Sequence, residues 1–569
     1  MWPKRNTIWH KIETTPEWDV LVVGGGITGA GILREASRAG LRALLIEQKD
    51  FAWGTSSRSS KMVHGGLRYL AQGQIGVTYQ SVKERQNLLQ AGEGLIKPLG
   101  FLMPSYKGGS SKWAYKAALS IYDLMALRWD HREYNADEMS MLAPRINREG
   151  LEGGFAFEDA QTDDARLVLR VMQEALADGG TALNYVRAET LLKDGDRVTG
   201  LRVCDAESGA QLDINARVVI NAAGAWVDHL RGQVGGEKRI RPLRGSHLIF
   251  PMWRFPVAQA ISFAHPWDRR PVFVYPWEGV TLIGTTDLDH TADLNREPQI
   301  TGEEVAYLMA ACQHQFPALA LNLDDVMSTY SGVRPVIGTG KERPSDEARD
   351  HMVWLEHGLL SVTGGKLTTY RILGLEALHM AASLFDTPPV FDDHAPALNP
   401  VGDMLPALPL SAEARQRLIG RYGENVVDLV TSAHEADFTP IPHTPTLWIE
   451  LRWAAHAEGV VHLDDLLLRR TRIGLLLPTG GMGIIDEIRG ICQPQLGWDD
   501  ARWMTEVERY QALWEQHYSL PPRETIPDWT AHIPTLTPKH KRHIWRRPLV
   551  ALLVVAGAAL VVRGARNQR

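Results

Sequence analysis

Three glycines and one acidic residue have a spacing typical of nucleotide binding. Gly24, Gly26 and Gly29 form a Gly-x-Gly-x-x-Gly pattern directly after an apolar run. Glycine in these places permits a tight turn, close approach of the backbone to a pyrophosphate, and close packing of a helix on a strand. Glu47 follows about 20 residues later, where a carboxylate holds a ribose hydroxyl. The pattern predicts a site for FAD or NAD rather than NADP, because the carboxylate would repel a further phosphate.

Short strands and one helix must position these residues. Val20 to Val23 and Ala43 to Ile46 are apolar runs typical of strands buried on both faces. Between them, Gly29 to Ala39 suits a helix that Gly40 would end, and the free N–H groups at its start would face the phosphates. The alternative interpretation is a glycine-rich turn in an ordinary α/β domain. Further strands are predicted at Val218 to Ala223 and at Leu359 to Val362, and a hairpin at Pro271 to Asp287.

Composition narrows the class of protein. A chain of 569 residues is too long for one core, so two to four domains are expected. Hydrophobic residues make up 44% and charged residues 22%, which is typical of globular proteins. The net charge of −6 gives no support for nucleic-acid binding as the main task. The 3 cysteines lie far apart without a CxxC pair, so neither a disulfide framework nor a metal site is predicted.

A cluster of small hydroxyl residues follows the second predicted strand. Thr55, Ser56, Ser57, Ser59 and Ser60 stand beside Gly54, and His64-Gly65-Gly66 comes soon after them. Backbone and hydroxyl donors in such a run can wrap a flavin or a phosphate. A solvated Ser/Gly loop explains the same residues, and this stretch alone does not decide between the two.

Longer segments add a family resemblance. They are GGGITGAG (24–31), GTSSRSSKMVHGGLRYL (54–70), FEDAQTDDARLVLR (157–170), VVINAAGAWVD (218–228), RPLRGSHLIFP (241–251), LIGTTD (282–287), YSGVRP (330–335) and LLSVTGGKLTTYR (359–371). Together they resemble the FAD-dependent glycerol-3-phosphate dehydrogenase family, the aerobic and membrane-associated kind. The similarity runs from about Asp19 to about Leu520.

The resemblance implies a fold of the α/β class, which is α+β when the whole chain is considered. A Rossmann-like FAD-binding domain would carry an inserted antiparallel-sheet substrate domain and a C-terminal helical domain. The implied boundaries are 17–75, 155–235 and 330–390 for the FAD-binding domain, 76–154 and 236–329 for the substrate domain, 397–520 for the helical domain, 521–547 for a proline-rich and basic linker, and 548–563 for an apolar tail.

The resemblance also implies site residues. His247 is the candidate base, and Lys366 would place a cation beside the anionic edge of a reduced flavin. Arginines bind phosphate oxygens in pairs. The substrate-binding candidates are Arg68, Tyr69, Arg334, which is also a catalytic candidate, and Arg349, with Arg343 as a rival to Arg349. The cofactor-binding candidates are Gly24, Gly26, Gly29, Glu47, Thr55, Ser56, Ser57, His64, Gly65, Gly66, Ala223, Gly224, Gly364, Gly365, Lys366, Leu367 and Thr368. Taken alone, His247 also fits a hydrogen-bonded structural histidine, and each cation fits a surface residue.

The implied reaction is oxidation of sn-glycerol-3-phosphate to dihydroxyacetone phosphate. Hydride would pass from C2 to FAD N5, His247 would take the hydroxyl proton, and electrons would go on to a membrane quinone. Three alternatives stay open: an oxidase that uses oxygen, a related FAD oxidoreductase acting on another hydroxy or amino acid, and an inactive membrane-tethered binding module. A homodimer is possible.

Two stretches are candidates for contact with a lipid bilayer. Ser111 to Arg128 suits either a helix in the lipid interface or a buried core helix. Leu549 to Val562 is an uninterrupted apolar run, flanked by Arg547 and Arg563, whose helical length of about 21 Å is shorter than the ~30 Å hydrocarbon core. It would insert in the membrane or dock on the globular body. The expected location is the cytoplasmic face of the inner (plasma) membrane, peripheral or tail-anchored.

The C-terminal region contributes one further prediction. Leu463 to Ile473 has apolar residues three and four apart, as in an amphipathic helix. Its three arginines, Arg469, Arg470 and Arg472, are predicted to form a charged face toward solvent.

Overall fold

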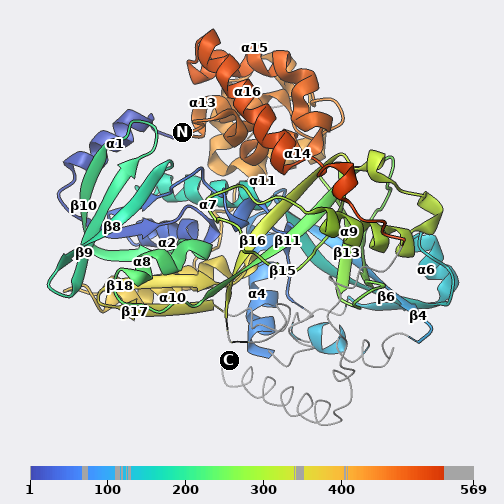
Figure 1. Ribbon diagram of the computed structural model, residues 1–569. Coiled ribbons are helices and arrows are strands. Elements are labelled where there is room, and N and C mark those ends of the chain that lie inside the picture. The colour runs from blue at the N-terminus through green and yellow to red at the C-terminus, as the bar shows by residue number, and fades with distance from the viewer. Residues whose placement is uncertain are drawn as a thin grey trace.

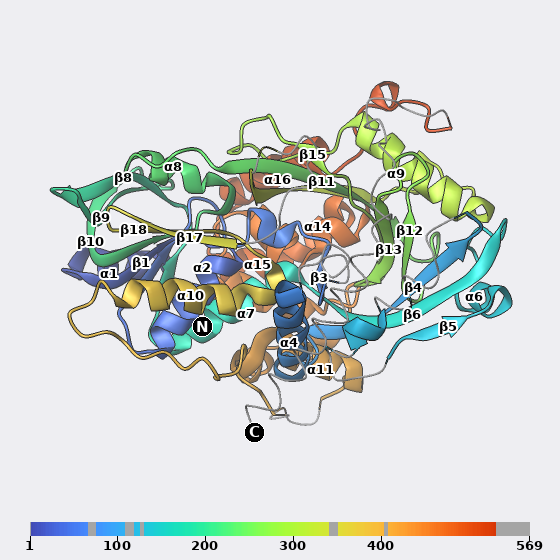
Figure 2. The same cartoon turned by 90° about the horizontal axis from the view of Figure 1, so that it is seen from below.

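The protein is described here by a computed structural model. It covers residues 2–66, 75–108, 116, 119–123, 125, 130–338, 340, 351–402, 405 and 408–530. Two sheets lie side by side below a group of C-terminal helices (Figure 1), and Figure 2 shows the two sheets from below.

The first sheet has the strand order β17-β18-β10-β1-β2-β7, with β8 and β9 joined to β10. Its strands are β1 (Trp18–Val23), β2 (Ala43–Ile46), β7 (Thr181–Leu183), β8 (Val186–Asp194), β9 (Arg197–Asp205), β10 (Gln211–Asn221), β17 (His351–Glu356) and β18 (Leu359–Gly364). The strands β18, β10, β1, β2 and β7 run parallel. The apolar runs predicted as strands at 20–23, 43–46, 218–223 and 359–362 all lie in this parallel part. They are buried because helices and further strands cover both faces.

The helix that follows β1 is α2 (Ile27–Arg38), which agrees with the prediction within two residues, and Gly40 beyond it has a φ of +77°. Helix α2 packs between α7 (Asp164–Ala177) and α10 (Tyr370–Ala382). In the part of the chain that the structure describes, the other helices outside the C-terminal region are α1 (Arg5–Thr14), α4 (Ile75–Ala91), α6 (Ala136–Leu142), α8 (Val227–Gly232) and α9 (Gly302–Gln315).

The second sheet is almost wholly antiparallel. Its order is β15-β11-β14-β13-β12-β4-β6-β3, with β16 paired to β11 and β5 paired to β6. Its strands are β3 (Met62–Val63), β4 (Ile96–Tyr106), β5 (Arg132–Tyr134), β6 (Leu151–Thr162), β11 (Ile240–Pro251), β12 (Ala260–Ala264), β13 (Pro271–Trp277), β14 (Val280–Gly284), β15 (Leu288–Asp289) and β16 (Ser328–Ile337). The hairpin predicted around Glu278 is confirmed, because β13 and β14 pair with Trp277 opposite Val280.

Strand pairing does not follow the predicted domain boundaries at three places. β3, β6 and β16 pair within the second sheet. The boundaries taken from the resemblance put 62–63, 155–162 and 330–337 in the cofactor-binding parts. Among the described strands the chain passes between the two sheets as many times as the boundaries imply, but β3 joins the second sheet earlier than predicted, and β6 and β16 leave it later.

The C-terminal region (residues 412–517) is helical. It contains α11 (Ala412–Tyr422), α12 (Val426–Thr431), α13 (Trp448–Ala457), α14 (Ile473–Leu476), α15 (Ile485–Leu496) and α16 (Asp500–His517). Instead of one amphipathic α-helix over 463–473, the chain forms a π-helical turn at Asp465–Arg470 and then the short α14. Arg472 lies between them with a φ of +66°.

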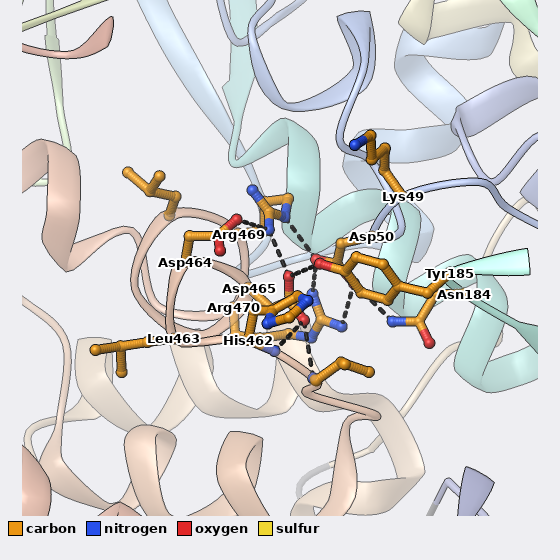
Figure 3. Close-up of polar contacts among 12 residues, drawn as sticks. Lys49, Asp50, Asn184, Tyr185, His462, Leu463, Asp464, Asp465, Arg469 and Arg470 are labelled. Carbon is orange, nitrogen blue, oxygen red and sulfur yellow. Dashed lines mark hydrogen bonds and ion pairs between the residues drawn. The ribbon is translucent and has the colours of Figure 1, made fainter. Parts of the chain in front are cut away.

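The prediction of a solvated arginine face is wrong. Arg469, Arg470 and Arg472 are each at most 1% exposed. Figure 3 shows Arg469 and Arg470 directed at Asp50, which follows β2 in the first sheet. Arg470 donates to both Asp50 oxygens at 2.6 and 2.9 Å, and Arg469 Nε donates to Oδ2 at 2.5 Å. Although burial raises the pKa of Asp50, the two guanidinium groups outweigh it and hold that pKa below its ordinary value.

We predict that Asp50→Ala destabilises the folded protein by roughly 3–5 kcal/mol, because the buried Arg470 loses its carboxylate partner, while Arg469 keeps Asp464 and Asp465. Unfolding by guanidinium chloride, followed by tryptophan fluorescence, measures the effect. The control is Asp213→Ala, whose partner Arg202 is 50% exposed and which should leave the midpoint unchanged. Equal midpoints for the two variants would contradict the prediction.

Candidate functional site

The carboxyl ends of four parallel strands meet at one edge of the first sheet. Gly24 follows β1, Glu47 follows β2, Ala222 follows β10, and Gly365 follows β18. Parallel strands bring the residues that follow them to the same edge, and this edge is where open α/β sheets bind ligands. Four distant parts of the chain therefore meet at this edge, among them the predicted cofactor residues Gly24, Glu47 and Gly365.

The glycine turn has the close backbone packing that its spacing predicts. Gly24 has a φ of +113°, and a Cβ added to it would lie 2.5 Å from the Ala222 oxygen. A Cβ on Gly29 would lie only 1.9 Å from the Gly24 oxygen. Gly26 is the N-cap of α2, and the Ile27 N–H donates to Ser56 Oγ at 3.0 Å. The tight turn places the start of α2 at this edge of the sheet, where a helix N-terminus can bind an anion such as a pyrophosphate.

Glu47 is tied to the same turn. Its carboxylate accepts the Gly25 N–H at 2.6 Å and the Lys49 N–H at 2.9 Å. Burial raises the pKa of Glu47 despite these donors. Each oxygen keeps a second lone pair, so the carboxylate can still accept a hydroxyl hydrogen from a ribose.

A run of seven residues, which we call the hydroxyl segment (Thr55–Lys61), connects the first sheet to the second. Ser56 lies at the glycine turn, and Thr55 Oγ1 donates to the Val333 oxygen in β16. Tyr330 OH of β16 donates to the Ser59 oxygen at 2.9 Å. The oxygen of Ser57 accepts from the side chains of Lys61 and Arg472. The solvated-loop interpretation is therefore wrong for this part of the run.

The remaining predicted cofactor residues lie after β3 of the second sheet or at and after the ends of β10 and β18 of the first. The His64 N–H donates to Thr368 Oγ1 at 3.1 Å, and the Gly65 N–H donates to Asp159 at 3.1 Å. Lys366 Nζ donates to Ser81 Oγ of α4 at 2.9 Å. The other positions are Gly66, Gly224, Gly364 and Gly365, all with positive φ, then Ala223, the N-cap of a 3-10 turn, and Leu367 in the 3-10 turn before α10.

His247 lies in β11 of the second sheet and is 2% exposed. Its ring stacks on Tyr330 of β16, with the centroids 4.6 Å apart and the planes at 8°. A Cβ on Gly284 of β14 would lie 2.1 Å from the ring, so glycine is needed there to leave room for it. Burial, and then the charges of Lys61 and Arg334, hold the pKa of His247 well below its ordinary value. The imidazole is therefore neutral at pH 7 and can accept a proton.

Arg334 shares a face of the second sheet with His247. The pairing of β11 with β16 places His247 opposite Tyr330, Gly245 opposite Gly332, and Leu243 opposite Arg334. Residues two apart along a strand point to the same side. A pair of glycines thus separates the stacked His247–Tyr330 pair from Arg334. The guanidinium of Arg334 donates to Asp287 at 3.0 Å and is 25% exposed.

Four predicted substrate residues lie outside the described part of the chain. They are Arg68, Tyr69, Arg343 and Arg349. Within the described ranges, no group of histidine, cysteine and carboxylate side chains is arranged to hold a metal ion.

Comparisons with known proteins agree with this geometry. Residues 19–371 match the family described as FAD dependent oxidoreductase, and residues 390–503 match the C-terminal domain of alpha-glycerophosphate oxidase. The aerobic glycerol-3-phosphate dehydrogenase of Staphylococcus haemolyticus is 35% identical over 483 residues, which cover 80% of this chain and 86% of that protein. The chain belongs to the aerobic glycerol-3-phosphate dehydrogenase family of FAD-dependent oxidoreductases.

Other relatives extend the match. The aerobic glycerol-3-phosphate dehydrogenase of Staphylococcus aureus is 34% identical over 80% of this chain and 86% of that protein. The glycerol-3-phosphate dehydrogenase of Bacillus halodurans, solved in complex with FAD, superposes with a TM-score of 0.72 at 28% identity and covers 90% of this chain and 97% of its own. The glycerophosphate oxidase of Mycoplasma pneumoniae, with FAD bound, has a TM-score of 0.53 at 18% identity and covers 68% and 100%, which shows a shared fold.

The residues at the sheet edge fit FAD, the cofactor of this family. Gly24 and Gly29 allow the tight backbone packing of the turn, which places the start of α2 where a pyrophosphate would bind. Glu47 stands where a ribose would lie. Ser56 lies beside Gly26, at the near end of the hydroxyl segment.

Sequence reasoning missed Lys61, Asp164 and Arg472 as parts of the site. All three are buried, Lys61 ends the hydroxyl segment, and both Lys61 and Arg472 donate to Asp164. A lysine directly before the apolar pair Met62-Val63 and the double acid Asp163-Asp164 were the available signals. Neither signal indicates its partner, because the pairs are separated by 103 and 308 positions along the chain.

We predict that Glu47→Gln weakens FAD binding by about tenfold to a hundredfold, because it removes a charged acceptor of both backbone and ribose hydrogens. Titration of the apoprotein with FAD, followed by flavin fluorescence, gives the dissociation constant. Glu413→Gln is the control, since its side chain is 84% exposed and lies in the C-terminal region. An FAD affinity equal to that of the parent protein would contradict the role of Glu47.

Proposed function

We propose that the protein oxidises sn-glycerol-3-phosphate at C2 to dihydroxyacetone phosphate. The observation that carries the proposal is a buried histidine on the same face as Arg334, connected by the hydroxyl segment to the glycine turn at the edge of the first sheet. A secondary alcohol that loses hydride needs a base for its proton, and a phosphate needs a cation. The names of the family members support the choice of substrate.

His247 takes the proton of the C2 hydroxyl in this proposal. Its low pKa keeps the imidazole neutral and therefore able to accept, and Lys61 and Arg334 nearby stabilise the negative charge that develops on the C2 oxygen. Arg334 binds the phosphate, and Arg68, Tyr69 and Arg349 or Arg343 complete the substrate site. FAD, when bound, accepts the hydride. Lys366 adds positive charge at the edge of the first sheet, where the cofactor lies.

The electron acceptor and the location belong to the same proposal. We propose a membrane quinone as the final acceptor, with the protein on the cytoplasmic face of the inner membrane, peripheral or anchored by its tail, and able to form a homodimer. The tail (548–563) and most of 111–128 lie outside the described residues. Among the helices that the structure describes, none has the length and apolar character needed to cross a bilayer.

An oxidase is the second candidate. Residues 390–503 match the C-terminal domain of alpha-glycerophosphate oxidase, a protein whose name indicates oxygen as acceptor. Reoxidation of the reduced enzyme by air compared with a soluble quinone separates the two candidates. A related oxidoreductase for another hydroxy or amino acid would show no dependence on the substrate's phosphate, and an inactive binding module would show no turnover.

We predict that glycerol-3-phosphate bleaches the bound flavin under anaerobic conditions, whereas glycerol at the same concentration does not. His247→Gln should slow the bleaching by about a hundredfold or more, the usual contribution of a general base, while FAD stays bound. Stopped-flow absorbance at the flavin band is the measurement. If neither compound bleaches the flavin, glycerol-3-phosphate is not the substrate. If the flavin of the His247→Gln variant is bleached at the full rate, His247 is not the base.

We also predict the pH range in which kcat/KM falls as His247 becomes protonated. The groups that face His247 are Lys61, Arg334, Ser60 and Tyr330, and burial together with the two cations holds its pKa below the ordinary value. A base with a lowered pKa is lost only when the pH falls through that lowered value. The proton-acceptor limb of kcat/KM therefore lies below pH 6.5. A fall that begins at or above pH 6.5 would contradict the assignment.

A further inference from the structure

The two nitrogens of His247 have different surroundings. Nε2 lies 3.0 Å from Ser60 Oγ, within hydrogen-bonding distance. Nδ1 is buried and has no hydrogen-bond partner among the described residues. A buried N–H group left without an acceptor is costly, whereas a serine hydroxyl can either donate or accept. The arrangement therefore favours the tautomer that carries its hydrogen on Nε2.

The imidazole ring has little freedom to turn. Tyr330 stacks on one side, and Gly284, where even a Cβ would touch the ring, lies on the neighbouring strand. Tyr330 is itself fixed by its hydrogen bond to the Ser59 oxygen. With the ring held in this way, the hydroxyl at Nε2 determines which nitrogen carries the hydrogen.

Ser60 is held by a buried cluster that we call the clamp (Ser59, Lys61, Asp164 and Arg472). One oxygen of Asp164 accepts from Lys61 Nζ at 3.0 Å and from Arg472 at 2.8 Å. The other oxygen accepts from the N–H and the hydroxyl of Ser59 at 2.9 and 2.7 Å. The residues on both sides of Ser60 are thus fixed through one carboxylate.

Arg472 is the part of the clamp that comes from the C-terminal region. Besides Asp164, it donates to the Ser57 oxygen at 2.7 Å and to the Leu468 oxygen at 2.7 Å. A planar guanidinium can make these bonds together, and an ammonium group cannot match their geometry. Burial, reinforced by the charge of Arg472, lowers the pKa of Lys61 to about 8. The C-terminal region therefore reaches the segment that touches His247.

We propose that Ser60 sets the tautomer of His247 and that Arg472, from the C-terminal region, holds Ser60 in place. Ser60 and Arg472 are positioning residues, and the inference rests on the proposed function. In the reaction, the hydrogen on Nε2 stays bonded to Ser60 Oγ, and Nδ1 receives the proton as the O–H bond of the C2 hydroxyl breaks. The C2 hydroxyl is then the missing partner of Nδ1.

Ser60→Ala tests the first half of the proposal. Without the hydroxyl, the Nε2–H tautomer loses its acceptor, so the rate of flavin reduction at saturating glycerol-3-phosphate should fall about tenfold. The dissociation constant for the substrate should stay the same, because Ser60 acts on the base alone. Ser60→Thr keeps a hydroxyl and should restore most of the rate. Crystals of the Ser60→Ala variant should also show whether the His247 ring has moved.

Arg472→Lys tests the second half through a double-mutant cycle. The variant keeps the positive charge but loses the planar guanidinium that makes several hydrogen bonds at once. It should therefore slow flavin reduction without changing substrate affinity. If Arg472 acts through Ser60, the double variant Ser60→Ala/Arg472→Lys should be no slower than Ser60→Ala alone. Arg470→Lys is the matched control, because this buried arginine lies two residues before Arg472 and binds Asp50 instead of the clamp. It should lower the melting temperature and leave the rate unchanged.

The outcomes separate this inference from the proposed function. If the parent protein is not bleached by glycerol-3-phosphate, the proposed function fails. If the parent is bleached and Ser60→Ala reduces its flavin at the parental rate, the tautomer assignment is overturned. Rate losses that multiply in the double variant would overturn the link from Arg472 to Ser60. A weaker substrate affinity in Ser60→Ala would place Ser60 in the substrate site instead.

Discussion

The burial of Asp164 is the constraint on which the rest of the site depends. Its carboxylate has no contact with solvent, and a buried charge is tolerated only when it is paired and fully hydrogen-bonded. Lys61, Arg472 and Ser59 satisfy it, and each of these groups fixes one part of the hydroxyl segment. That segment begins at the glycine turn, where the cofactor would bind, and ends beside His247. One buried carboxylate therefore sets the distance between the two halves of the site.

The C-terminal region is joined to this core by charge as well as by apolar packing. Asp163, next to Asp164, is buried, yet Arg472 and Arg421 outweigh the effect of burial and lower its pKa to about 2. Arg421 also reaches Glu450 in α13, and Arg166 of α7 forms a buried pair with Glu458 just beyond α13. Breaking any of these pairs leaves an uncompensated buried charge, so movement of the helices away from the sheets is strongly opposed. Helices that are distant in sequence from the glycine turn thereby help to fix the position of His247.

Local patterns in the sequence were sufficient for the cofactor side. The runs at 20–23 and 43–46 and the glycines between them depend on residues close along the chain, so strand, turn and helix could be predicted within about two residues. Lys61 and Arg472 could not be predicted in the same way. Their partner, Asp164, is distant in sequence, and an arginine on an apolar helix is normally solvated. The same limit applies to β16, which pairs with β11 although its motif suggested the cofactor-binding domain.

A crystal structure of the protein with FAD and glycerol-3-phosphate, prepared without oxygen, tests the central claim most directly. The account predicts the C2 hydroxyl oxygen at about 2.6–3.2 Å from Nδ1 of His247, with Nε2 still bonded to Ser60 and the phosphate on Arg334. A substrate hydroxyl bonded to Nε2, or a phosphate bound away from Arg334, would contradict it.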